Sequence, residues 1–170
     1  MLVKPKLIEF VEKYFQFPYK LNWHHKLFYL ILENLVFQRE DKKLDLIGEV
    51  SEKHKGYIDT LKGPFLNTRN RNILILAPRF HSKSSVFSFV YPIYEILHNP
   101  NIRILVLSAN TDIAKSFVRQ VLQFLDSNEE IIKDFGNLQP TTLRKWGEKA
   151  FIVKRSSTEK DPTMSASGIM

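Results

Sequence analysis

The sequence predicts an α/β fold in which a parallel sheet is flanked by helices and preceded by an N-terminal helical segment. Two short, mostly apolar runs, Ile73–Leu76 and Ile102–Leu107, have the length and composition of strands that are buried on both faces. Between the two runs, apolar residues recur with the period of an α-helix. A strand, a helix and a second strand in this order are expected to cross over right-handedly and to pair in parallel.

The amino-acid composition argues against a membrane-spanning or disulfide-stabilised protein and favours one with a polyanionic partner. The 170 residues are 44% hydrophobic, which is enough for one domain with a core, and no apolar run has the length of a membrane span. The sequence has no cysteine, so disulfides and thiolate sites are excluded, and its five histidines lack a repeated metal-ligand spacing. The net charge of +7 favours a polyanionic partner, and nucleic acid is the first candidate.

The first 66 residues are expected to be helical and to lead into a core at residues 67–170. An apolar helical stripe between Lys6 and Phe17 should be stopped by Pro18. Asn22 can cap a second helix that runs to about Gln38. The charge-rich stretch 39–62 is expected to form one or two exposed helices.

Beyond the second strand, the pattern predicts a capped helix, a short strand and an irregular tail. Asn110 or Thr111 should cap the helix, and Phe151–Val153 should form the strand. The Ser- and Thr-rich tail from Ser156 to Met170 is expected to be irregular. Pro92, inside the preceding helix, should kink it or loosen one turn. The inward positions of the capped helix are expected to be Ile113, Phe117, Val118, Val121, Leu122 and Leu125.

The segment after the first strand has the layout of a phosphate-binding loop. The sequence here predicts a buried strand, then a tight polar turn that ends in Lys83-Ser84, then a helix that begins at the turn. The start of such a helix offers free N–H groups and the positive end of its dipole, and both would lie next to the lysine. Lys83 would hold the outer phosphates, and the Ser84 hydroxyl is placed to ligate Mg²⁺. The residues expected to contact the nucleotide in this loop are Pro78, Arg79, Phe80, His81, Ser82, Lys83, Ser84 and Ser85.

The loop departs from the usual pattern of such loops. That pattern has glycine at its first position and again immediately before the lysine, where this chain has Ala77 and Ser82. Glycine serves there because the backbone adopts unusual angles and approaches the phosphate closely. A strand, a turn and a helix also occur in many α/β proteins without nucleotide chemistry, so the spacing by itself leaves both interpretations open.

The order of the elements resembles the large terminase subunits of tailed bacteriophages, in which the loop often reads Ala-Pro-Arg-Gly-His-Gly-Lys-Ser. The resemblance extends from about Trp23 to the C-terminus, with departures at Phe80 and Ser82, where the common form has glycine. The matching positions in the loop are Ala77, Pro78, Arg79, His81, Lys83 and Ser84. Outside the loop they are Tyr91-Pro92, Asn99-Pro100, Ser108-Ala109-Asn110, Trp146, Asp161-Pro162-Thr163 and Ser165–Gly168.

This resemblance implies a motor that binds ATP and Mg²⁺ and drives double-stranded DNA into a capsid. Arg79 would add a second cation near the γ-phosphate, and Arg119 resembles the arginine that some members insert into a neighbouring subunit's site. A surface arginine on a solvated face is the alternative for Arg119. Trp23, His24 and His25 fall where the family contacts adenine, although an aromatic residue packing at a helix entry would look the same. Implied partners are the portal protein, the small terminase subunit and further copies in a ring, in the cytoplasm of an infected bacterial host.

A P-loop ATPase uses an apolar strand that ends in a carboxylate to hold Mg²⁺ and to orient water. The sequence contains no such strand. In terminases it follows soon after the segment that resembles Asp161–Gly168, so the sequence looks like an incomplete front portion. This chain by itself is therefore expected not to hydrolyse ATP. Two alternatives remain: a non-catalytic, P-loop-like module for assembly or DNA contact, and a fragment of a helicase-like motor.

Overall fold

The computed structural model describes residues 7–17, 21–37, 75–140 and 146–169. The chain divides into two compact units, residues 1–83 and 84–170, and each unit is described by itself. The predicted boundary between residues 66 and 67 and the charge-rich stretch 39–62 lie outside the described residues, so both stay predictions.

In the first unit, helices α1 (Leu7–Tyr14) and α2 (Trp23–Phe37) pack against each other. The buried side of α1 includes Phe10 and Val11, and the buried side of α2 includes Tyr29 and Leu32. As predicted, α2 begins directly after Asn22, whose carbonyl oxygen accepts the Lys26 amide N–H at 3.2 Å. The backbone N–H of Asn22 in turn donates to Nδ1 of His25 at 3.0 Å. A side chain three residues into the helix thus satisfies the cap residue, as Glu or Gln does in a capping box.

The second unit opens with a helix in two parts, η3 (Ser85–Val90, π-helical) and α4 (Tyr91–His98). The amide N–H of Tyr91 donates to the carbonyl of Val86, five residues earlier, which is the π-helical spacing. Pro92 has no N–H to continue the ordinary ladder and its ring crowds the preceding turn. The loosened turn that Pro92 predicts is therefore confirmed.

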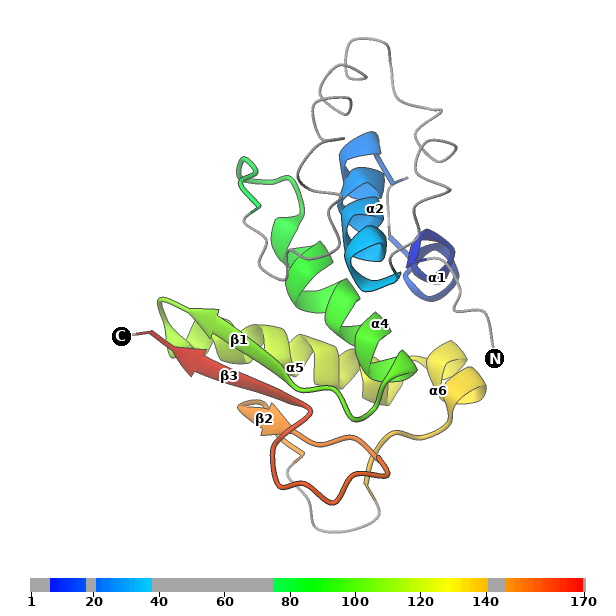
Figure 1. Ribbon diagram of the computed structural model, residues 1–170, viewed down its shortest axis with the longest axis vertical. Coiled ribbons are helices and arrows are strands. Elements are labelled where there is room, and N and C mark those ends of the chain that lie inside the picture. The colour runs from blue at the N-terminus through cyan, green and yellow to red at the C-terminus, as the bar shows by residue number, and fades with distance from the viewer. Residues whose placement is uncertain (1–6, 18–20, 38–74, 141–145, 170) are drawn as a thin grey trace. The chain divides into compact units, whose positions relative to one another are not determined.

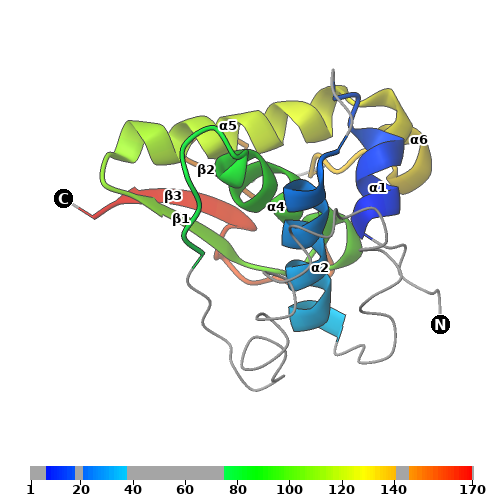
Figure 2. The same cartoon turned by 90° about the horizontal axis from the view of Figure 1, so that it is seen from above.

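A small mixed sheet carries the rest of the second unit, so the chain is α/β (Figure 1). Strand β1 (Ile104–Ser108) pairs in parallel with β3 (Met164–Gly168), which pairs antiparallel with the two-residue strand β2 (Ala150–Phe151). The expectation of a wholly parallel sheet is corrected by β2. Helix α5 (Thr111–Ser127) covers one face of the sheet in both views (Figures 1 and 2). The short α6 (Glu129–Phe135) follows α5, with Asn128 as its cap.

The strand register separates a covered face from an open one. Ile104 pairs with Met164 and Val106 with Ala166, and the buried Met164 and Ala166 mark the covered face. Alternate residues point to the opposite face, where Leu105 and Leu107 are 59% and 55% exposed. The second strand was predicted to be buried on both faces. This is wrong for one face, because within the described residues only the other carries a helix.

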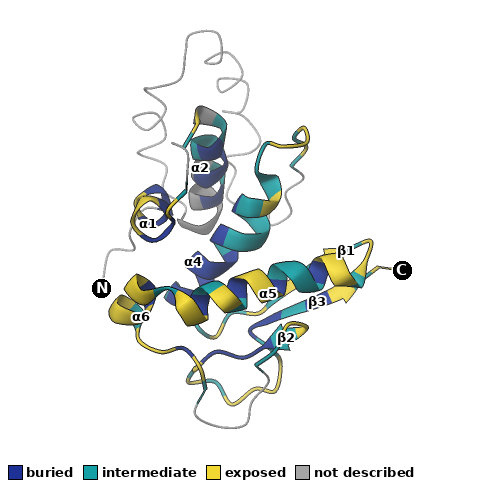
Figure 3. Cartoon of the chain, turned by 180° about the vertical axis from the view of Figure 1, so that it is seen from behind, coloured by how far each residue is buried: buried dark blue, intermediate teal, exposed yellow. Residues whose placement is uncertain are grey.

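The helical core of this unit is formed by η3, α4 and α5, and burial alternates with exposure around α5 (Figure 3). Asn110 caps α5 as predicted, since its side-chain oxygen accepts the Asp112 N–H at 2.7 Å. Of the positions expected to point inward, Ile113 is 51% exposed, because it lies in the first turn at the helix end. The buried residues of these helices are Val86, Val90, Ile93, Tyr94, Ile96, Leu97, Ala114, Val118, Val121 and Leu125.

Two predictions for the C-terminal part are corrected. The tail, expected to be irregular, contributes the central strand β3, because small residues let its backbone lie close to α5. The distance that a Cβ at Gly168 would have from Oγ1 of Thr111 is only 2.4 Å. The strand expected at Phe151–Val153 is shorter, and Ile152 and Val153 are buried outside it. The backbone N–H of Val153 there donates to the Thr163 side chain, which replaces a ladder partner.

Candidate functional site: a loop with the layout of a phosphate cradle

The predicted first strand is corrected where the structure describes it. Ile73 and Leu74 lie outside the described residues, and Ile75 and Leu76 have no regular secondary structure. Leu76 is 86% exposed instead of buried. A strand needs a neighbour for its backbone N–H and C=O groups, and no strand of the described residues pairs with this segment.

The loop itself takes unusual backbone angles at two positions. Phe80 and Ser82 have φ values of 65° and 54°, and they are the only non-glycine residues with positive φ in the described chain. This left-handed conformation costs a residue with a Cβ about 1–2 kcal/mol relative to glycine. Phe80 and Ser82 are also the two positions at which the common form of the loop in the resembling family has glycine. The turn geometry that favours glycine is therefore present although the glycines are not.

Lys83 closes the turn from inside. Its ammonium donates to the carbonyl oxygens of Ala77 and Pro78, both at 2.7 Å. Hydrogen bonds from a charged donor are the stronger kind and hold the turn together.

His81 joins the loop to the start of α2. The imidazole of His81 lies with its centroid 5.2 Å from that of His24, and the His24 and His25 rings are 4.0 Å apart. Nδ1 of His81 lies 3.0 Å from the carbonyl oxygen of Arg79. The predicted nucleotide contacts His24 and His25 thus lie beside the loop, whereas the side chain of Trp23 lies outside the described residues.

The pKa values of His24 and His25 are both below the ordinary value of 6.5. For His24 the first cause is burial, and the second is the nearby His81. For His25 burial is again first, followed by His24 and then His81. Both effects disfavour a positive charge on the His24 and His25 imidazoles.

The remaining loop residues are open to solvent. Arg79 and Pro78 are exposed, and the exposed Phe80 side chain makes no burying contact with the described residues. Ser84 has helical backbone angles (φ −63°, ψ −39°) and no side-chain capping bond, and Ser85 begins η3. The hydroxyl predicted to ligate Mg²⁺ is thus at the start of a helix.

Arg119 is held by a carboxylate of its own unit. It forms an ion pair with Glu148, and both side chains are about half exposed. Exposed pairs of this kind contribute little to stability, on the order of 0–1 kcal/mol. To serve in a neighbouring subunit's site, Arg119 would first have to leave Glu148.

One buried carboxylate was not singled out from the sequence. Glu95 is 8% exposed in α4, and Tyr91, four residues earlier, hydrogen-bonds to it. Burial first, and then the charge of Glu95, raise the pKa of Tyr91 well above its ordinary value. The i, i+4 spacing was the available signal. Glu95 lies eleven positions after Ser84 along this helix, about 16 Å at roughly 1.5 Å per residue, which is too far for a shared Mg²⁺.

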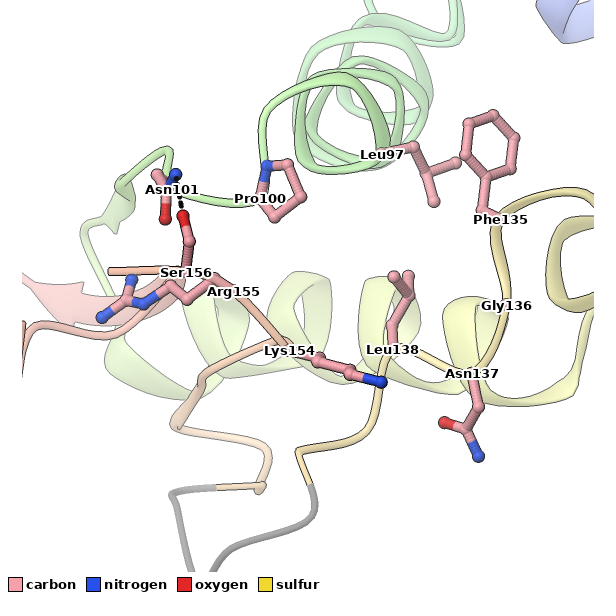
Figure 4. A pocket seen from close by; sticks show the side chains of 10 residues that line it. All are labelled: Leu97, Pro100, Asn101, Phe135, Gly136, Asn137, Leu138, Lys154, Arg155 and Ser156. Atoms are coloured by element: carbon pink, nitrogen blue, oxygen red, sulfur yellow. Dashed lines mark hydrogen bonds between the residues drawn. The ribbon is translucent and has the colours of Figure 1, made fainter. Parts of the chain in front are cut away.

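A separate cavity of about 540 Å³ lies in the second unit (Figure 4). One wall is apolar, with Leu97, Pro100 and Phe135, and Lys154 and Arg155 come from the opposite side. The guanidinium of Arg155 donates to the carbonyl oxygens of Glu159 and Asp161, so it braces the loop between them. None of the predicted site residues lines this cavity.

The described residues contain neither a metal-binding cluster nor a membrane-spanning helix. No group of three or more His, Asp or Glu side chains there could hold a metal ion, and no helix there is long and apolar enough to cross a membrane. Comparison with known protein families, curated proteins and solved structures found no match to this chain.

Proposed function

We propose that the loop Ala77–Ser85 binds ATP or ADP with Mg²⁺, and that the chain is part of a DNA-packaging motor of the terminase type. The observation that carries the proposal is the pair of positive φ values at Phe80 and Ser82. Successive residues that alternate between right-handed and left-handed backbone conformations can form a concavity of N–H groups that suits phosphate. The left-handed conformation occurs here at the two positions at which the resembling family has glycine.

The chemistry of the side chains supports the same site. Lys83 brings its ammonium across the turn, and Arg79 is exposed beside it. Arginine stays charged and can hold two phosphate oxygens with its planar fork. Ser84 follows with a hydroxyl at the start of the helix, the position from which a serine ligates phosphate-bound Mg²⁺. DNA as the macromolecular partner follows from the resemblance and from the net charge of +7.

A non-catalytic, P-loop-like module is the second candidate, and one observation favours it. Glu95, the buried carboxylate of the described residues, is too far along its helix to share a metal with Ser84. A chain that binds nucleotide without hydrolysing it would serve assembly or DNA contact. Turnover of ATP separates the two candidates.

Calorimetric titration of the full chain with Mg·ATP and Mg·ADP tests the site. Removing Lys83 (Lys83→Ala) should weaken binding by about ten- to a hundredfold, because a hydrogen bond to a charged group contributes about 1.5–3 kcal/mol. Lys133→Ala, which removes an exposed lysine from α6, is the matched control and should bind like the wild type. Equal heats of binding for the wild type and Lys83→Ala, or no binding at millimolar nucleotide, would contradict the assignment of a nucleotide site to this loop.

A further inference from the structure

The histidine trio His24, His25 and His81 adjoins the candidate phosphate loop. The three rings lie with centroids 4.0 and 5.2 Å apart, and His81 belongs to the loop itself. Imidazole is the side chain whose charge changes between about pH 5 and 8. A trio in this place can therefore exchange protons with solvent when an anion enters the loop.

Hydrogen bonds assign different roles to two members of the trio. Nδ1 of His25 accepts the backbone N–H of Asn22 at 3.0 Å, so a proton on that nitrogen would break the cap of α2. Nδ1 of His81 lies 3.0 Å from the Arg79 carbonyl, which only accepts, so this nitrogen carries the hydrogen. Nε2 of His81 can then take a second proton without loss of that bond.

Within the described residues, burial and neighbouring histidines, not a carboxylate, set the direction in which the pKa values of His24 and His25 shift. The loop contributes Arg79 and Lys83, α2 contributes Lys26, and α1 carries Glu9, Glu12 and Lys13. Lys26 and Lys83 are half-buried, and the other four are exposed. Burial and the mutual repulsion of the rings lower the pKa values of His24 and His25. A proton on His24 or His25 is therefore disfavoured unless a negative group arrives, and a phosphate is such a group.

We propose that binding of the nucleotide phosphates is coupled to the uptake of one proton from solvent by the His24–His81 pair, with Nε2 of His81 as the acceptor. This inference rests on the proposed nucleotide site. Only one proton is expected for the pair, because two imidazolium rings at 5.2 Å repel each other. His25 stays neutral as a structural acceptor.

Linkage sets the direction and size of the effect. If the complex binds more protons than the free chain, affinity rises as pH falls. An uptake of between about half a proton and one proton gives a three- to tenfold tighter complex per pH unit near pH 6.5. Keeping the nucleotide as its Mg²⁺ complex holds the terminal phosphate ionised, so that the histidines dominate the titration.

The test is calorimetric titration of the full chain with Mg·ADP at pH 6.5 in two buffers of different ionisation enthalpy. The difference in heat gives the number of protons taken up. We expect about half a proton to one proton for the wild type and a value near zero for the double variant His24→Asn/His81→Asn. His98→Asn, which changes a histidine that stacks on Tyr94 in α4, should keep the wild-type value.

Imidazole NMR gives an independent readout: the Cε1–H resonance of His81 should move toward the imidazolium position when Mg·ADP is added. Binding with no proton uptake, or with equal uptake by wild type and the double variant, overturns the coupling and leaves the nucleotide site standing. Absence of binding in every buffer overturns both.

Discussion

Gly168 in β3 lies so close to Thr111 at the start of α5 that a Cβ on the glycine would be 2.4 Å from Oγ1 and 3.1 Å from the backbone nitrogen of Thr111. This contact fixes how closely the central strand and the helix on its face approach each other. It also explains why the strand Met164–Gly168 is built from small residues where it meets α5.

Gly168→Ala should therefore destabilise the second unit by about 1–3 kcal/mol, the usual cost of overpacking. Denaturant unfolding followed by circular dichroism measures the change. Adding Thr111→Ala to Gly168→Ala should restore part of the lost stability, because it removes the Oγ1 contact but leaves the contact with the backbone nitrogen. Gly147→Ala is the control, since the nearest atom to its added Cβ would be 4.0 Å away. Equal stability of Gly168→Ala and Gly147→Ala would contradict the close packing.

Replacing Phe80 and Ser82 by glycine should stabilise the loop conformation. Each residue with φ near 60° loses about 1–2 kcal/mol to steric strain, which glycine avoids at an entropic cost of about 0.5–1 kcal/mol. Nucleotide affinity should rise, by up to about tenfold, to the extent that the wild-type loop leaves this conformation before binding. Calorimetry with Mg·ADP measures the affinity. An unchanged or weaker affinity would show that Phe80 and Ser82 already suit the site.

The 170-residue chain should not turn over ATP by itself. Phosphoryl transfer needs a carboxylate that fixes Mg²⁺ and a group that orients water, and Glu95 is too far from Ser84 to supply either. Loss of a proton-transfer group alone typically lowers the rate by about a hundredfold to ten-thousandfold.

A phosphate-release assay with and without DNA measures this turnover, and release should stay at background. Steady release that disappears in Lys83→Ala would mean that a catalytic acid is present. The first residues to replace would be Asp112, which pairs with Lys115 at the start of α5, Asp134 in α6, and Asp161, which pairs with Arg103.

Stability of the first unit should fall as pH falls below neutral. The folded pKa values of His24 and His25 lie below 6.5, so the unfolded chain binds more protons than the folded chain between these values. By linkage, the free energy of unfolding decreases as pH drops through about 6.5 toward the lower folded values. Urea unfolding at a series of pH values across this window measures the slope.

The double variant His24→Gln/His25→Gln isolates the histidine contribution, because glutamine at position 25 can still accept the Asn22 N–H as in a capping box. We expect a shallower pH dependence for this variant than for the wild type. The same slope in both proteins would exclude these two histidines as its origin.

Local signals in the sequence were sufficient for the starts of two helices and for one loosened helical turn. The start of α2 after Asn22, the cap at Asn110 and the loosened turn at Pro92 each depend on a few neighbouring residues, and all three appear as predicted. The glycines of the resembling family indicated unusual backbone at Phe80 and Ser82, and both have positive φ values. Ala77, where the general loop pattern also has glycine, does not have a positive φ.

Tertiary structure decided the rest, because strand formation and side-chain clusters depend on partners distant in the sequence. The segment Met164–Gly168 has little intrinsic strand preference, and it becomes a strand through pairing with β1 and contact with α5. His81 contacts His24, which lies 57 positions earlier in the sequence. Arg119 pairs with Glu148, which lies 29 positions later. No local pattern encodes such distances. The resemblance suggested that His24 and His25 lie near the nucleotide, and the folded chain brings them beside His81 of the loop.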